Sequence, residues 1–177
     1  MFLKPKCIRA NSGVSKIVDA LALIGKDTTP LFVCISGASG CGKSFLGRFI
    51  RKGGLPGYPM RKVSVIDDGV MSRNLLGGLF RPKIRFPSVG KDELIPFQPY
   101  ISSGVRVIFF VCSTPLERVS RCDLLIVLHC DDKTRRQRLI SREGVKALER
   151  LQRECAAGVE VYPEAAMRLD LDSVDLF

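Results

Sequence analysis

The sequence predicts an α/β fold: a three-layer sandwich in which a parallel sheet of about five strands carries helices on both faces. Short apolar runs alternate with amphipathic stretches along the chain, which is the pattern of consecutive βαβ units. Two of the runs, 106–112 and 123–130, are apolar almost throughout, as expected of strands buried on both faces. With 177 residues, of which 46% are hydrophobic, the chain is expected to form one domain, 1–177, around a substantial core.

The first half of the chain is expected to hold two helices and two strands. Apolar residues recur at helical spacing over 13–26, and Gly25 lies near the end of that helix. The elements that follow are strand 31–35, a glycine-rich loop, helix 44–52, a turn rich in glycine and proline at 52–59, and strand 62–66.

The second half begins with an irregular region at about 69–103 that is rich in glycine and proline. Long irregular stretches inside a domain are usually functional, so this region is interpreted as a substrate-binding excursion. The elements expected after it are strand 106–112, strand 123–130, a helix over 133–143 capped by Asp131 or Asp132, a second amphipathic helix over 144–158 and a short strand near 167–171.

The segment Gly37–Ser44 reads Gly-Ala-Ser-Gly-Cys-Gly-Lys-Ser and fits the phosphate-binding pattern G-x-x-x-x-G-K-[ST]. It lies between a predicted strand and a predicted helix, which is the context that this motif requires. Glycines let the backbone approach phosphate oxygens, and the first N–H groups of the following helix stabilise an anion. A glycine-rich turn that merely connects a strand to a helix is the alternative interpretation.

The loop therefore predicts ATP and Mg²⁺ as cofactors. Lys43 is expected to contact the β- and γ-phosphates, and the Ser44 hydroxyl to be a ligand of Mg²⁺. An oxidised or alkylated Cys41 would clash with ATP. The residues of the loop expected to bind the cofactor are Gly37, Ala38, Ser39, Gly40, Cys41, Gly42, Lys43, Ser44 and Phe45.

The net charge of +10, from 28 Lys and Arg against 18 Asp and Glu, favours anionic partners. Nucleic acid is one candidate, and a small, multiply charged substrate beside ATP is the other. The arginines occur in short groups and form no long basic tail, which favours the small substrate. A solvated basic surface accounts for many of these charges on either interpretation.

Several other classes of protein are disfavoured. No apolar run approaches the length of a membrane span, and the N-terminus lacks the apolar core of a signal peptide. The seven cysteines form no C-x-x-C pair, so reduced thiols in a cytoplasmic protein are expected. The single histidine, His129, is expected to be a core residue, and it supports neither zinc nor serine-hydrolase chemistry. The base-reading motif of GTPase switches is absent from the sequence.

Three features, in this order along the chain, resemble the P-loop nucleoside, nucleotide and small-metabolite kinases. They are the loop Gly37–Ser44, the acidic pair that ends Val63–Asp68, and the segment Cys122–Gly144 with its strand, capped helix and spaced arginines. The helix upstream of the loop is similar to the uridine kinase-like branch, and the Arg-Glu-Gly ending resembles the dephospho-coenzyme A kinases. The similarity covers Leu31 to about Leu176 in outline. One departure is that strand 106–112 lacks the aspartate that many P-loop proteins use for Mg²⁺.

The resemblance implies a catalytic role for Asp67 or Asp68, in which a carboxylate accepts the proton of the substrate hydroxyl or orients that hydroxyl. Asp67, the slightly preferred residue, is also expected to bind the substrate and to join Ser44 around Mg²⁺. Both residues follow a strand, at the sheet edge where α/β proteins bind ligands. The alternative is that Asp68-Gly69 is only a turn dipeptide.

Two groups of basic residues complete the expected site. Arg135, Arg138 and Arg142 share one helical face in an arginine-bearing lid at about 131–145. Arg135 is expected to bind the cofactor, and Arg138 and Arg142 to stabilise the transferring phosphoryl group. In the excursion, Arg73 and Arg81 are expected to bind an anionic acceptor. Solvated charge is the alternative for both groups.

The function expected is therefore an ATP-dependent kinase of a small anionic acceptor: a nucleoside, a nucleotide or a phosphorylated metabolite. A polynucleotide 5′-kinase is the first alternative, because it would use the basic charge of the chain. A nucleotide-binding regulator with a degenerate kinase fold is the second, because the aspartate is missing from strand 106–112.

Overall fold

The computed structural model describes residues 12–25, 30–72, 82–86, 92, 94–144, 147 and 162–176. Its strands are β1 (Leu31–Ser36), β2 (Val63–Asp67), β3 (Val70–Ser72), β4 (Lys83–Arg85), β5 (Val107–Val111), β6 (Arg121–His129) and β7 (Glu164–Asp172). Its helices are α1 (Ser12–Ile24), α2 (Lys43–Gly53), α3 (Pro115–Arg118) and α4 (Asp132–Glu143), with 3-10 turns η1 (Met60–Lys62), η3 (Ile95–Tyr100) and η4 (Ser173–Asp175).

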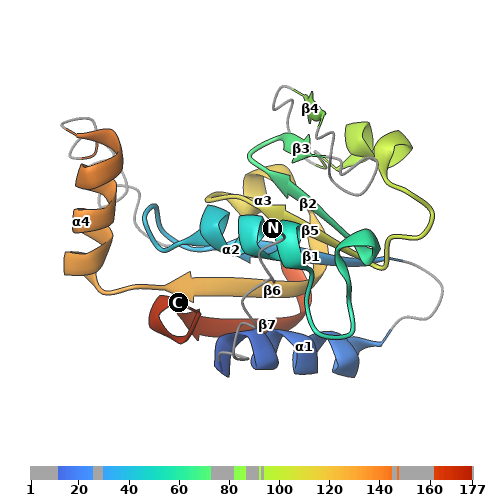
Figure 1. Ribbon diagram of the computed structural model, residues 1–177, viewed down its shortest axis with the longest axis horizontal. Helices are drawn as coiled ribbons and strands as arrows, with labels where there is room; N and C mark the ends of the chain where they lie inside the picture. Colours follow the sequence, from blue (N-terminus) through green and yellow to red (C-terminus); the bar gives the residue numbers. More distant parts are fainter. Residues whose placement is uncertain are drawn as a thin grey trace, which may run out of the picture.

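The strands form one sheet in the order β4-β3-β2-β5-β1-β6-β7 (Figure 1). The five strands from β2 to β7 in this order are parallel, which confirms the α/β class and a parallel core. The expected strand number of about five is wrong for the whole sheet, which has seven strands. The extra strands, β3 and β4, are antiparallel and have three residues each, too short for a periodic pattern to show in the sequence.

β1 is the central one of the five parallel strands, with β5 on one side and β6 on the other. Val33, for example, pairs with Phe109 of β5 and with Leu124 of β6. Alternate residues of β1 belong to different halves of the core: Val33 and Ile35 face one half, and Cys34 faces the other. The loop that leaves β1 therefore starts from a strand that is paired on both sides.

One face of the sheet is covered by α1 and α2. Ile17 and Leu21 of α1 and Leu46 and Ile50 of α2 are buried in the first half of the core. On this face α1 lies over β6 and β7, and α2 lies over β2 and β5 (Figure 1).

The opposite face is covered, within the described residues, by shorter elements. Phe97 of η3 and Val119 after α3 are buried in the second half of the core. Phe97 also packs edge-on against Phe86, with 5.0 Å between ring centroids. The helix expected over 144–158 lies almost entirely outside the described residues, so the second helical layer is not described in full.

α4 stands apart from both layers, beyond the carboxyl ends of β6 and β7 (Figure 1). Asp131 caps it, because its Oδ1 accepts a hydrogen bond from the Thr134 N–H at 2.8 Å. That hydrogen bond holds the pKa of Asp131 below its ordinary value. Among the described residues, no helix is both long and apolar enough to cross a membrane.

Candidate functional site

The predicted site residues that the structure describes lie at or beyond one edge of the sheet. The carboxyl ends of the parallel strands meet there, and Gly37 and Asp67 stand at the ends of β1 and β2. β5 lies between these two strands, and α2 crosses from the β1 loop toward β2. Open parallel sheets bind ligands at this edge, at the point where the connections from two neighbouring strands run in opposite directions along the sheet.

The loop after β1 needs glycine at two positions because of what lies against it. Gly37 has φ 133°, and a Cβ there would lie 2.3 Å from the Leu128 carbonyl oxygen of β6. Gly40 has φ 89°, and its Cβ would lie 2.9 Å from the Arg135 carbonyl oxygen and 3.0 Å from Leu139 Cγ, both in α4. The loop is therefore held against β6 and α4 by contacts that a side chain would prevent.

Gly37→Ala is expected to lower the free energy of unfolding by about 3 kcal/mol or more, from left-handed strain plus the contact with a backbone oxygen. Gly57→Ala is the matched control, because Gly57 also has positive φ, 79°, but a Cβ there would meet nothing within 4 Å. The control should lose only about 1–2 kcal/mol. Urea denaturation of both variants measures the difference, and equal losses would show that the Leu128 contact is unimportant.

Lys43 lies inside the loop rather than in solvent. Its side chain is folded back so that Nζ donates to the carbonyl oxygens of Gly37, at 2.5 Å, and Ala38, at 2.9 Å. The residue is only 8% exposed. At the start of α2, the Phe45 and Leu46 N–H groups donate to the Gly42 carbonyl, at 3.0 and 2.9 Å. The loop thus combines a fixed ammonium group with the positive end of a helix, and both attract an anion.

The two residues expected to bind Mg²⁺ are in contact. Ser44 Oγ donates a hydrogen bond to Asp67 Oδ1 at 3.1 Å, so a hydroxyl of α2 and a carboxylate of β2 lie side by side. Mg²⁺ is bound in proteins by such oxygens together with water and substrate phosphates. In the part of the chain that the structure describes, no group of three or more His, Cys, Asp or Glu side chains could hold a metal by itself. The pair therefore fits an ion that is shared with a phosphate ligand.

Asp67 is half-buried, and burial raises the pKa of its carboxyl above the ordinary value. The hydrogen bond from Ser44 and the charges of Arg51 and Arg48 lower that pKa, whereas the charge of Asp68 raises it, and the net shift is upward. A carboxylate with a raised pKa is a better proton acceptor at neutral pH than an ordinary aspartate.

Asp68 has a different setting. It and Gly69 both have positive φ, 46° and 73°, and they connect Asp67 of β2 to its antiparallel partner Val70 of β3. Two left-handed residues between paired strands are the pattern of a type I′ hairpin, for which Asp-Gly is a preferred sequence. The turn explains the backbone of Asp68, which is exposed, and its catalytic role stays a prediction.

The structure separates the three arginines expected on one face of α4. Arg135 is 8% exposed, lies against Gly40 of the loop and contacts Asp132 Oδ1 through Nη2 at 3.1 Å. Arg138 Nη1 lies 3.4 Å from Ser173 Oγ, beyond the end of β7. Arg142 pairs with Glu143, with its side chain 56% exposed. Arg135 thus lies against the loop, and the transition-state roles of Arg138 and Arg142 stay predictions.

Arg73 and Arg81 lie outside the described residues. Instead, the structure places two arginines of α2 near Asp67, for which the sequence alone predicted no role. Arg48 Nε donates to the Ser44 carbonyl at 3.2 Å, and Arg51 Nη1 donates to Ser72 Oγ of β3 at 3.1 Å. Their spacing, four and seven residues after Ser44, is the signal that could have placed them on the Ser44 face of the helix.

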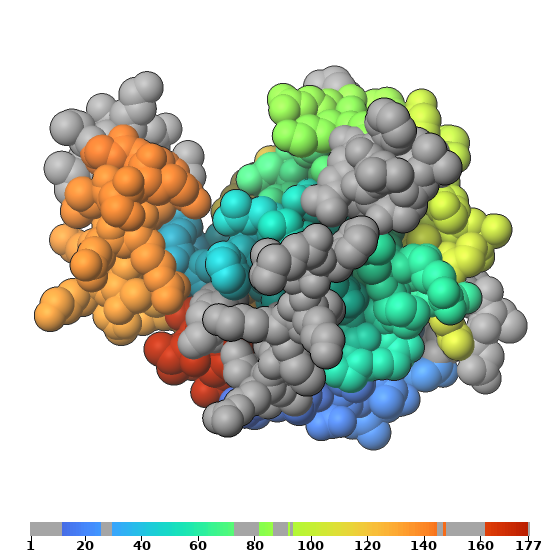
Figure 2. Space-filling model, viewed as in Figure 1, coloured from blue at the N-terminus to red at the C-terminus, as the bar shows by residue number. Residues whose placement is uncertain are grey.

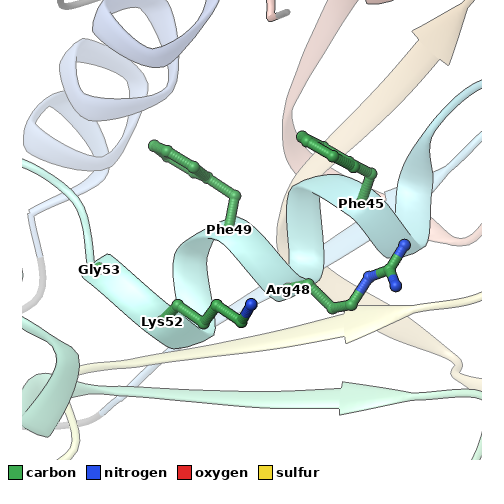
Figure 3. Close-up of a pocket in the computed structure, with 5 residues that line it drawn as sticks. All are labelled: Phe45, Arg48, Phe49, Lys52 and Gly53. Atoms are coloured by element: carbon green, nitrogen blue, oxygen red, sulfur yellow. The ribbon is translucent and has the colours of Figure 1, made fainter. Parts of the chain in front are cut away.

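The outer side of α2 has a hollow of about 410 Å³, lined in the described part by Phe45, Arg48, Phe49, Lys52 and Gly53. The Phe45 and Phe49 rings project on one side of the helix, and Arg48 and Lys52 lie along another (Figure 3). Phe45 is 52% exposed on this side of the helix, and its expected role in binding the cofactor stays a prediction.

The expectation that His129 is a core residue is wrong. Its side chain is 52% exposed, because His129 is the last residue of β6 and extends past the core. Nε2 lies 2.7 Å from Asp170 Oδ1 of β7, and Asp170 also accepts two hydrogen bonds from Arg168. Chiefly through Arg168, these neighbours lower the pKa of Asp170.

The molecular surface is deeply notched between α4 and the rest of the molecule, and the segment that contains the loop lies at the floor of the notch (Figure 2). In comparisons with known proteins, no family model and no curated sequence matches the chain.

Proposed function

We propose that the protein is a P-loop kinase that transfers the γ-phosphoryl group of Mg-ATP to a hydroxyl or phosphate of a small anionic acceptor. The observation that carries this proposal is the meeting of three groups at one sheet edge. They are the Lys43 ammonium within the loop, the Ser44 hydroxyl at the start of α2 and the Asp67 carboxylate that accepts its hydrogen bond.

The loop residues Gly37–Ser44 would surround the β- and γ-phosphates with backbone N–H groups, and Lys43 would turn its ammonium from the loop carbonyls toward these phosphates. Ser44 and Asp67 would hold Mg²⁺, which when bound supplies charge neutralisation at the phosphate oxygens. Arg135 would close the loop against α4 through its contact with Gly40. Notched surface lies next to this loop (Figure 2), which leaves room for the donor.

For a hydroxyl acceptor, the chemistry required of the chain is alignment and a proton acceptor. The acceptor oxygen forms a bond to the γ-phosphorus while the bond from that phosphorus to the β,γ-bridging oxygen breaks, and ADP leaves. The hydroxyl proton passes to an oxygen of Asp67, which the contact with Ser44 places at the sheet edge beside the loop. Arg138 and Arg142 are proposed to act on the charge of the transferring group when α4 approaches the donor.

The proposal is tested by measuring ADP release from Mg-ATP with a panel of nucleosides, nucleoside monophosphates, phosphorylated metabolites and a 5′-hydroxyl oligonucleotide. Stimulation by at least one small acceptor, lost when EDTA removes Mg²⁺, supports it. ATP binding with no stimulation by any acceptor would favour a nucleotide-binding regulator. Stimulation by the oligonucleotide alone would favour a polynucleotide kinase.

We also propose a cytoplasmic location. Cys34, Cys41, Cys112, Cys122 and Cys130 are reduced cysteines in the structure, which suits a reducing compartment. Cell fractionation tests this placement.

A further inference from the structure

One face of α2 carries two arginines toward the β2–β3 edge of the sheet. Ser44, Arg48 and Arg51 are spaced i, i+4 and i+7, so they lie on the same face of the helix. Ser44 reaches Asp67 of β2, and Arg51 reaches Ser72 of β3. This face of α2 therefore extends from the loop, past Asp67, to β3.

Both guanidinium groups are oriented by hydrogen bonds. Arg48 Nε donates to the Ser44 carbonyl oxygen at 3.2 Å, and the Arg48 side chain is exposed. Arg51 Nη1 donates to the Ser72 hydroxyl at 3.1 Å, and Arg51 is half-buried. Each of these hydrogen bonds uses one N–H of a guanidinium group that has five, and it orients the side chain.

The hydrogen bonds place both arginines beside Asp67. Arg48 donates to the carbonyl oxygen of Ser44, the residue whose hydroxyl contacts Asp67. Arg51 contacts Ser72 of β3, the strand that pairs with β2, which ends at Asp67. Both arginines can therefore act on a molecule bound beside Asp67. Their backbone positions are only about 4.5 Å apart along the helix axis, so both side chains can reach a single phosphate group.

We propose that Arg48 and Arg51 form the anion subsite of the acceptor, and that they bind a phosphate monoester group of a small molecule whose free hydroxyl faces Asp67. This inference rests on the proposed kinase function and names the chemical class of its acceptor. Guanidinium groups are well suited to such a group, because their paired N–H donors match phosphate oxygens in charge-assisted hydrogen bonds. The subsite and Lys43 are on opposite sides of Ser44 along α2, so donor and acceptor phosphates have separate cations.

The direct test uses inorganic phosphate as the probe. The nucleotide site is first saturated with Mg²⁺ and a non-hydrolysable ATP analogue, and phosphate binding is then measured by calorimetry at constant ionic strength. Arg48→Gln and Arg51→Gln are each expected to weaken phosphate binding at least about tenfold, as the loss of a charge-assisted hydrogen bond implies. Lys52→Gln is the matched control, because it removes the same charge from the adjacent part of α2, and it should change binding less than about twofold.

The second test compares acceptors that differ only in a phosphate, such as adenosine with adenosine 3′-monophosphate and ribose with ribose 5-phosphate. The wild-type protein should use the phosphorylated member of a pair at least about tenfold more efficiently, through KM, and both arginine variants should lose that preference. Affinity for the ATP analogue should stay unchanged, and Arg48→Lys should restore part of the preference.

The outcomes separate this inference from the proposed function. If the ATP analogue does not bind the wild-type protein, the kinase proposal fails, and phosphate binding that depends on Arg48 and Arg51 would still identify an anion site. If the analogue binds but phosphate affinity is the same in both arginine variants, or falls equally in Lys52→Gln, the subsite is wrong. Preference for a 5′-hydroxyl oligonucleotide over every small phosphate ester, with steep salt dependence, would also overturn it.

Discussion

Lys43→Ala is expected to remove measurable ATP binding at micromolar nucleotide and to lower turnover by about two to three orders of magnitude. The Lys43 ammonium is the cation fixed within the loop, where it donates to the Gly37 and Ala38 carbonyl oxygens. Charge-stabilising donors that are preorganised in this way contribute about 100- to 1,000-fold to turnover in enzymes, and Lys43 is proposed to act on binding as well. Fluorescence titration with a labelled nucleotide and an ADP-release assay measure the two effects.

The matched control for this variant is Lys52→Ala. Lys52 is on the same helix and carries the same charge, but its side chain lies along the outer surface of α2 (Figure 3). The Lys52→Ala variant should keep both its nucleotide affinity and its turnover within about twofold of the wild type, because exposed charges contribute little. Because Lys43 also holds two loop carbonyls, thermal denaturation of both variants is needed to show that each remains folded. A folded Lys43→Ala protein that binds ATP normally would refute the assignment of the loop.

The inner strands of the parallel sheet, such as β1 and β5, could be predicted because burial on both faces leaves a strong signal in the sequence. Phe109 and Phe110 of β5, for example, face opposite halves of the core, so both neighbours in the sequence must be apolar. β7 was predicted too short for the opposite reason. It is an edge strand within the described sheet, and alternate residues such as Arg168 and Asp170 are exposed, so the apolar run that marks a buried strand is missing.

The β3–β4 extension was not predicted although the sequence contains one clue. Asp68-Gly69 is a favoured hairpin dipeptide, and Met71 is the buried residue of a three-residue strand. The dipeptide alone indicates a turn that closes a strand, but no partner strand of normal length follows it. Strands of three residues depend on their neighbours in the sheet rather than on their own pattern.

The site shows what residue spacing predicts and what it leaves open. Ser44 and Asp67 were expected around one Mg²⁺, and the sheet edge brings them into contact. The spacing of Arg135, Arg138 and Arg142 predicts that they share one face of α4, but it does not predict what that face contacts. Seven residues of helix span about 10.5 Å, so Arg135 lies at the loop whereas Arg142 is exposed. For Arg48 and Arg51, the spacing from Ser44 alone predicts no role. Their role is suggested only by the positions of β2 and β3 beside α2.

Asp67→Asn and Asp68→Asn are expected to have very different effects on turnover. Asparagine at 67 keeps the shape of the side chain and an oxygen that accepts the Ser44 hydrogen bond, but it cannot accept the substrate proton and has no charge for Mg²⁺. General-base catalysis contributes about 100- to 10,000-fold, so turnover should fall by that amount while affinity for nucleotide persists. Asp68→Asn should stay within about threefold of the wild type, since asparagine suits the left-handed conformation of the hairpin at 68.

Stability measurements distinguish loss of chemistry from loss of structure in these variants. Burial raises the pKa of Asp67, so the folded protein binds its proton more tightly than the unfolded chain does, and ionisation of Asp67 at neutral pH opposes folding. In Mg²⁺-free buffer, Asp67→Asn should therefore be at least as stable as the wild type at pH 7. That advantage should shrink as the pH falls through the raised pKa toward the ordinary value of about 4. An Asp67→Asn protein that is equally folded and retains full turnover, or a pair of variants with equal and mild losses, would show that Asp67 is not the proton acceptor.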